Sequence, residues 1–324
     1  MTFGSVRGRK APRGVGRDAG KRGILIAAVV AFLLVDIGLV AVALNSVAPA
    51  PESAATTAPA ASAAPSPSPT PSPSVAPAPA SVVPARMLEA VDASTAWRAT
   101  TGACPDALAL PELTVDSGAT FTATDATGPA DIVALQSIVA GSGDVATFVG
   151  QSALDCSPLV ARTFVAGANY GVFPEGLDGA WYVDAANRAQ IHRPGGLVPA
   201  PCASVVSLSA RDAANAAVLC DDGTIVTTAD AAETWSAPVA APGAMNLAAT
   251  ADGYLVASVA VLGCDGVQVG LLGDAVVPSG CLPVAVEPSA LAGNIALSVA
   301  DDGTLWVWAG DALGRSGDGG ASWL

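Results

Sequence analysis

The sequence predicts an all-β domain that is preceded by one membrane-spanning helix and a disordered, proline-rich linker. Three observations support this prediction. Positions 24–44 form one apolar run, a Pro/Ala/Ser stretch follows it, and the rest of the 324-residue chain consists of short Val-, Ala- and Leu-rich segments separated by Gly, Asp-Gly or Pro. Short apolar segments broken by turn residues are typical of many strands joined by tight turns.

The N-terminal part predicts a type II membrane topology. Residues 1–22 carry seven Lys or Arg and one acid, and the 21 residues of 24–44 carry one charge, Asp36. An apolar helix of this length spans roughly 30 Å, and the basic flank places the N-terminus in the cytoplasm. We therefore expect a basic cytoplasmic tail (1–22), a transmembrane helix (23–45) and an extracytoplasmic C-terminal domain at the cell membrane.

The alternative to a retained anchor is a cleaved signal peptide, for which Ala41–Ala43 offers small residues, but the apolar run is longer than a usual signal-peptide core. Asp36 has no second charge in the span with which to pair. We interpret it as a charge that a long span tolerates.

Residues 46–85 predict a stalk, because they hold eleven prolines among Ala, Ser, Thr and Val. In the polyproline II conformation this stretch reaches about 120 Å. Residues 86–324 carry 25 acids against seven Arg and no Lys. This charge repels phosphate backbones, so we expect no nucleic-acid partner.

Internal repeats indicate how the domain is built. An Asp-Gly pair followed by a strand-like run recurs at 178–183, 222–226, 252–256 and 302–307, and in three of the four cases an apolar run precedes the pair. Each such unit is typical of a β-hairpin. In the last one, Trp306 and Trp308 alternate with Leu305 and Val307, which predicts a strand packed on both faces.

A second motif, Ser/Thr-x-Asp-x-Gly-x-Ser/Thr-Trp, accompanies some of these units. It is complete at 316–323, has Phe in place of Trp at 114–121, and has Ala in place of Gly at 228–235. These segments resemble the Asp-box, or BNR-repeat, β-propellers, which include sialidases and photosystem II assembly-factor propellers. The motif is a turn that stabilises itself, and its expected structural residues are Thr114, Asp116, Gly118, Phe121, Thr228, Asp230, Trp235, Ser316, Asp318, Gly320 and Trp323.

The resemblance implies a β-propeller, and the spacing of the motif predicts about six blades, with seven as the alternative. The distances 114–228 and 228–316 divide into units of 38 and 44 residues, close to a propeller period. Because the chain stops soon after Trp323, we expect a strand from residues 86–100 to supply the outermost strand of the last blade and close the ring.

Six cysteines in an exported domain predict three disulfides. Fifteen pairings are possible, and hairpin repeats favour the pairing of neighbours, Cys104–Cys156, Cys202–Cys220 and Cys264–Cys281. A single His and no CxxC pair give no zinc-site pattern, so we expect neither metal nor cofactor.

Catalytic residues are not identified by the sequence. Resemblance to sialidases implies three arginines that clamp a carboxylate, a Tyr–Glu nucleophile pair and an Asp acid, but the nearest match to the family's arginine motif, 191–194, lacks its order and its aromatic residue. The candidates are Arg98, Arg162, Arg188, Arg193, Arg211, Arg315, Tyr170, Tyr182, Tyr254, Glu112, Glu175, Glu233 and Glu287.

The anchor, the stalk and a repeat scaffold without a catalytic pattern favour a binding or assembly module for an envelope protein or glycan. The alternative is a sialidase-like glycoside hydrolase on the cell surface. A sensor whose Asp36 helix engages a signalling partner is a third hypothesis.

Overall fold

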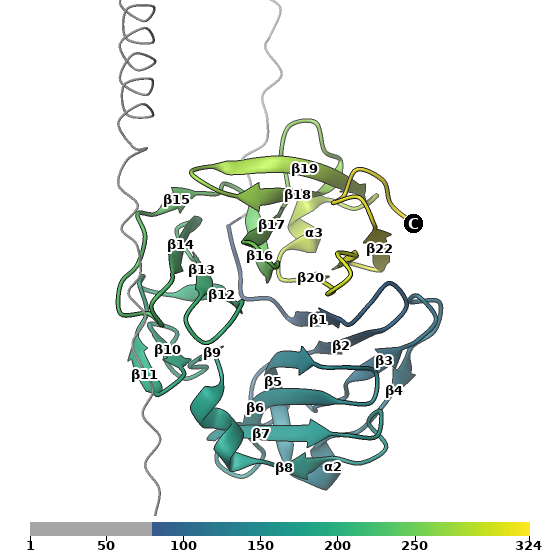
Figure 1. Cartoon of the computed structure of the whole chain (residues 1–324), viewed down its shortest axis with the longest axis vertical. Helices are drawn as coiled ribbons and strands as arrows, with labels where there is room; N and C mark the ends of the chain where they lie inside the picture. The colour runs from purple at the N-terminus through teal and green to yellow at the C-terminus, as the bar shows by residue number, and fades with distance from the viewer. Residues whose placement is uncertain (1–79) are drawn as a thin grey trace, which may run out of the picture. The chain divides into compact units, whose positions relative to one another are not determined.

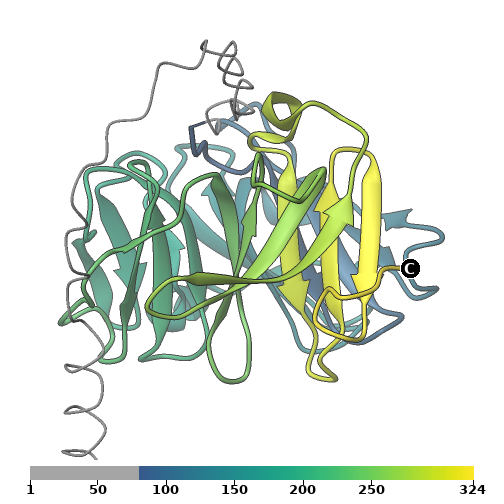
Figure 2. The same ribbon diagram turned by 90° about the horizontal axis from the view of Figure 1, so that it is seen from above.

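The computed structural model describes residues 80–324, which form a ring of six antiparallel sheets (Figures 1 and 2). The expected cytoplasmic tail, the membrane span and most of the linker lie outside these residues. Within 80–324, no helix is long and apolar enough to span a membrane. The all-β propeller with six blades is confirmed.

Each sheet is a blade made of consecutive strands, and we number the blades one to six in chain order. The first three blades are β1 (Arg86–Ala90), β2 (Ala96–Thr100), β3 (Glu112–Thr114) and β4 (Thr122–Ala123); β5 (Ile132–Ala140), β6 (Ala146–Ser152), β7 (Pro158–Thr163) and β8 (Gly171–Val172); and β9 (Tyr182–Val183), β10 (Gln190–Arg193) and β11 (Gly196–Pro199).

The other three blades are β12 (Val205–Ala210), β13 (Ala216–Cys220), β14 (Thr224–Thr228) and β15 (Val239–Ala240); β16 (Ala244–Ala249), β17 (Tyr254–Ser258), β18 (Gly266–Leu272) and β19 (Val276–Pro283); and β20 (Ile295–Val299), β21 (Leu305–Ala309) and β22 (Ala312–Ser316). Three short helical segments join blades: α2 (Thr127–Ala130), η1 (Pro174–Gly179) and α3 (Pro288–Leu291).

In five blades the first strand lies innermost, next to the first strand of a neighbouring blade: β1 contacts β5 and β20, and β16 contacts β12 and β20. In the third blade the inner place is taken by β9, which contacts β5 and β12. The inner strands therefore surround one axis, and the chain's first and last blades are neighbours (Figure 1).

The third blade has three strands. The first of them, β9, runs in the direction that the second strand has in the other blades. In the first and sixth blades, a Trp near the start of the second strand donates its indole N–H to the turn of the next blade: Trp97 to the Ser142 carbonyl (3.3 Å) and Trp306 to the Asp92 carbonyl (3.0 Å). Trp181, just before β9, does the same to the Asp212 carbonyl (3.1 Å). Thus β9–β11 correspond to strands two to four, and η1 precedes them in place of a first strand.

The expectation that residues 86–100 complete the last blade is wrong. They form β1 and β2, which pair with each other from Arg86–Thr100 to Ala90–Ala96 in the first blade. A turn of five residues joins these strands, so this pairing closes a far shorter loop than pairing with the last blade would. At the outer edge of the sixth blade, Arg315 and Leu324 exchange two backbone hydrogen bonds of 2.8 and 3.2 Å instead.

The ring closes at a seam between the sixth and first blades that is made by side chains. Trp306 and Trp308 face Leu88, Ala90 and Ala96 in one apolar cluster. The guanidinium of Arg86 lies 4.3 Å from the Trp308 ring centroid. Leu305 and Val307 point to the fifth blade, so the prediction that this strand packs on both faces is confirmed.

Polar contacts fix the register of the seam at both ends. The Ser298 hydroxyl accepts the Ala90 N–H (3.0 Å), and the Asp302 carboxylate accepts the Ala93 N–H (3.0 Å). Arg86 donates to the Gly310 carbonyl.

The structure contains three disulfides, in the pairing of neighbours that the sequence predicts: Cys104–Cys156, Cys202–Cys220 and Cys264–Cys281. The first joins the loop after β2 to the second blade. The others each stay within or beside one blade.

Loss of the indole donor at the seam is expected to destabilise the domain. Trp306 is fully buried, so Trp306→Phe leaves the Asp92 carbonyl without its donor, at a cost of about 1–3 kcal/mol. Urea unfolding followed by circular dichroism measures this change. Trp235→Phe is the control, because the Trp235 indole makes no hydrogen bond to the described residues; equal losses in both variants would contradict the seam interpretation.

Candidate functional site

One end of the ring carries two kinds of turn, and we call it the box face. The turns between first and second strands lie here (91–95, 141–145, 211–215, 250–253 and 300–304), and so do the Asp-box turns. Backbone hydrogen bonds join the two kinds within a blade, from Ser117 N to Ser94 O (2.9 Å) and from Ala231 N to Ala214 O (2.9 Å). The box face is therefore a layer of connected turns.

The three expected Asp-box turns share one set of hydrogen bonds. At 228–235 the Thr228 hydroxyl donates to Asp230 (2.8 Å) and accepts the Ala232 N–H (3.0 Å), while the Asp230 carboxylate accepts the N–H and hydroxyl of Thr234. The turns at 114–121 and 316–323 repeat this pattern. Bonds from the Thr or Ser at the seventh position are the main cause that lowers the pKa of Asp116, Asp230 and Asp318 to about 2.

A fourth turn of this kind, which the motif did not predict, lies at 163–170. The Thr163 hydroxyl accepts the Gly167 N–H (2.9 Å), as the first residue of each other box does, and Ala166 N donates to Asp144 O (3.0 Å). Val165 stands where the Asp should be, which hid the motif. The remaining signals, Thr163, Gly167 and the aromatic Tyr170, were available in the sequence.

The even spacing expected for the boxes is consequently wrong. The four turns begin at 114, 163, 228 and 316. The third blade replaces its box by the short Pro194–Gly195 hairpin turn, and the fifth by the turn at 273–275 between β18 and β19. A hairpin turn pairs the backbone groups at the strand ends directly, without the side-chain hydrogen bonds of an Asp box.

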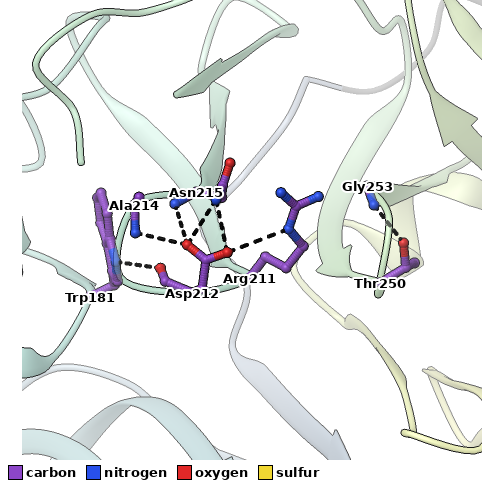
Figure 3. Close-up of polar contacts among 7 residues, drawn as sticks. All are labelled: Trp181, Arg211, Asp212, Ala214, Asn215, Thr250 and Gly253. Atoms are coloured by element: carbon purple, nitrogen blue, oxygen red, sulfur yellow. Dashed lines mark hydrogen bonds and ion pairs between the residues drawn. The ribbon is translucent and has the colours of Figure 1, made fainter. Parts of the chain in front are cut away.

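Figure 3 shows the box face where the third, fourth and fifth blades meet. The Asp212 carboxylate accepts the Ala214 N–H (2.8 Å) and both backbone and side-chain N–H of Asn215, and Arg211 Nε lies 3.8 Å from Asp212 Oδ2. Thr250 accepts the Gly253 N–H (2.9 Å) in the next turn. The carboxylate holds its own turn, so its charge is engaged locally.

Glu89 is a titratable group at the inner ring, on β1 between β5 and β20. Its carboxyl group is partly buried, and the Ser298 hydroxyl lies 3.4 Å from Glu89 Oε2. Desolvation raises the pKa of Glu89 to about 7, against hydrogen bonds from Ser298 and Ala140, and the Asp301 charge raises it further.

The arginines proposed as candidates for a carboxylate clamp are spread over five blades. Most serve the fold: Arg98 pairs with Glu112 (2.5 Å), Arg188 donates to Val205 O (2.6 Å) and Val206 O, Arg193 donates to Pro194 O, and Arg315 donates to Ala93 O (2.8 Å). Arg211 faces Asp212, and Arg162 stacks on Phe173. The structure does not bring three of them together.

The tyrosine and glutamate candidates are likewise separate. The Tyr170 hydroxyl contacts Thr124 (2.5 Å), Tyr182 stacks on His192, and the Tyr254 hydroxyl is buried without a partner among residues 80–324. Glu175 lies in η1, Glu233 in a box turn and Glu287 before α3. Among the described residues, no group of three His, Cys, Asp or Glu is placed to hold a metal ion.

Comparison with known proteins finds no matching family model and no matching curated protein. Similar solved structures include "YCF48 bound to D1 peptide" (17% identity, 77% of this chain and 69% of that chain, TM-score 0.28) and YCF48 from Cyanidioschyzon merolae (18%, 77% and 88%, 0.39). Another is a GH74 xyloglucanase from Xanthomonas campestris (16%, 74% and 37%, 0.29). At these identities the likeness concerns the fold and identifies no ligand.

Restoring the missing carboxylate in the fourth turn is expected to stabilise the domain. In Val165→Asp, the new carboxylate can accept the Thr163 hydroxyl and the Asn169 N–H, and each such bond contributes about 1 kcal/mol. Thermal unfolding should show a higher Tm. Val115→Asp adds the same charge at the second position of the box at 114–121, where Asp116 already accepts the corresponding donors, and should not raise the Tm. A lower Tm for Val165→Asp would contradict the assignment.

The stability contributed by Glu89 is expected to fall as pH rises. Its folded pKa of about 7 exceeds the unfolded value of 4.5, so the folded state keeps a proton that the unfolded state loses between these values. Glu89→Gln should therefore gain stability relative to the wild type from pH 4.5 to 8, on the order of 3 kcal/mol. Chemical unfolding across this range measures the gain. The exposed Glu287→Gln is the control, and a gain that does not change with pH would overturn the prediction.

Proposed function

We propose that this chain is a membrane-anchored, extracytoplasmic propeller of the Asp-box type that serves as a binding or assembly module for a cell-envelope partner. The apolar run 24–44 and its basic flank support the anchor. Three disulfides and the absence of free cysteines among the described residues agree with an oxidising compartment.

The observation that carries the proposal is how the stalk meets the domain. Residues 80–85 lie against the end of the ring opposite the box face. Ser81 Oγ donates to the Ala244 carbonyl (2.6 Å) at the start of β16, and Ala85 N donates to the Gly293 carbonyl (2.7 Å) in the loop before β20. The end of the stalk is thus fixed to the ring by bonds to the fifth blade and the following loop.

This attachment leaves the box face uncovered by the linker residues that the structure describes. Residues 80–85 lie at the other end of the ring, so the turns of the box face are open to a partner. Turns from the blades converge there, and propellers bind partners through such loops. The repeated hydrogen bonds hold these turns before any partner arrives, which lowers the entropic cost of binding.

Fractionation tests the anchor. The full chain is expected to stay with the membrane pellet after alkaline carbonate extraction and to lose its C-terminal domain when protease is added to intact spheroplasts. A chain that lacks residues 23–45 should be in the soluble fraction. A full chain that is extracted by carbonate would refute the anchor.

Site-specific photocross-linking in the same strains tests whether the box face contacts a partner. A photoreactive residue at Ala213 on the box face should give a reproducible cross-link to one envelope protein. The same residue at Leu262, in the loop between β17 and β18 at the other end of the ring, should not. Cross-links from Leu262 alone would refute the box face as the contact surface, and cross-links from neither position would refute the binding role.

A further inference from the structure

The shortened third blade leaves part of the second blade uncovered. The side of the second blade that faces the third bears Val149 and Val160, which are buried under Tyr182, Leu177 and Ala180. The next row on this side, toward the box face, is formed by three paired residues: Val139 is opposite Thr147, and Thr147 is opposite Arg162. Val139 is 61% exposed.

The uncovered row continues to the end of the sheet. Side chains two residues apart on a strand share a face, so Val145 and Phe164 lie on the same side as Thr147 and Arg162. Phe164 is 55% exposed and packs edge-on against Phe173 (5.7 Å between centroids). We call Val139, Val145, Phe164 and Phe173 the apolar strip.

The strip surrounds an unpaired cation. The Arg162 guanidinium lies 5.3 Å from the Phe173 centroid, and its Nε is buried without a hydrogen-bond partner. Each of the other six arginines of residues 80–324 donates to a carbonyl or faces a carboxylate. The Arg162 guanidinium alone has neither a hydrogen bond nor an ion pair with the described residues.

A guanidinium that has no partner in a half-buried side chain favours an incoming acceptor at its terminal N–H groups, and a carboxylate is the acceptor that matches its charge and geometry. The domain is strongly acidic, with seven Arg against 25 acids, so a cation without an ion pair is a rare point of attraction for a carboxylate. The apolar strip beside Arg162 adds contact area for an aliphatic or aromatic side chain.

We propose that the apolar strip and Arg162 form a docking site for an extended polypeptide segment of a partner protein, in which an Asp or Glu stands next to an apolar residue. The carboxylate binds the guanidinium, and the apolar side chain covers Val139, Val145 and Phe164. This inference rests on the proposed role as a binding module and names its site and the chemistry of its partner.

Selection from a random peptide display library tests the site without knowledge of the partner. The bait is the full chain in lipid nanodiscs, and empty nanodiscs remove peptides that bind lipid. We expect the enriched peptides to contain Asp or Glu beside Leu, Val or Phe. Basic or unpatterned sequences, or no enrichment, would overturn the proposal.

Binding of the most enriched peptide, measured by fluorescence anisotropy, locates the site. Phe164→Ser and Arg162→Gln should each weaken binding at least tenfold, and the effect of Arg162→Gln should shrink in high salt. Leu154→Ser is the matched control at an exposed position elsewhere and should change binding less than twofold. Circular dichroism melting confirms that each variant is folded.

Unchanged binding in both Phe164→Ser and Arg162→Gln would overturn the site. Such a result, together with a reproducible cross-link from Ala213, would reject the strip and keep the binding role. If one of the two variants fails to fold, the other still decides the question.

Discussion

A ring of sheets is stable only if its last member packs against its first, and the rest of this structure depends on that seam. Many closed rings share a sheet between the two ends of the chain. Here each blade is made of consecutive residues, and side chains close the ring: Trp306 and Trp308 enter the apolar interface, while Asp302 and Ser298 bind backbone N–H groups of the first blade. The large buried surface of these tryptophans stabilises the closure in place of backbone hydrogen bonds between the two ends of the chain.

The same physical device recurs around the ring on a smaller scale. An indole N–H from one blade binds the turn of the next at three junctions, and an Asp-box turn binds the first turn of its own blade at three places. The first turns of the first, second, fourth and sixth blades are thus bonded to their own blade or to its neighbour, whereas the turn at 250–253 is held by bonds within itself. The carboxylates of Asp116 and Asp230 accept hydrogen bonds from their own turns. Their negative charges therefore stabilise the turns more than they attract a partner.

The sequence predicted those features that arise from local contacts. The box at 316–323, the hairpins around Asp222 and Asp302 and the disulfides Cys202–Cys220 and Cys264–Cys281 all involve residues that are close in the chain. Ring closure and the turn at 163–170 were mispredicted or missed, because the partner of β1 depends on competition between pairings and because Val165 removed the one residue that marks the motif. Arg162 was a candidate only for catalysis, since a missing partner is a property of packing that no pattern displays.

The third blade shows how a local sequence can change a surface two strands away. Residues 173–201 contain Pro174, Pro194, Pro199 and Pro201, and proline cannot donate to a strand ladder. A 3-10 turn accordingly takes the place of the first strand, and β9 has two residues. Such a blade covers Val149 and Val160 but is too short to reach Val139 and Phe164. The exposed apolar residues beside the Arg162 guanidinium are therefore a consequence of where the prolines lie. A partner that supplies a carboxylate and an apolar side chain offsets both the exposed apolar surface and the unpaired charge.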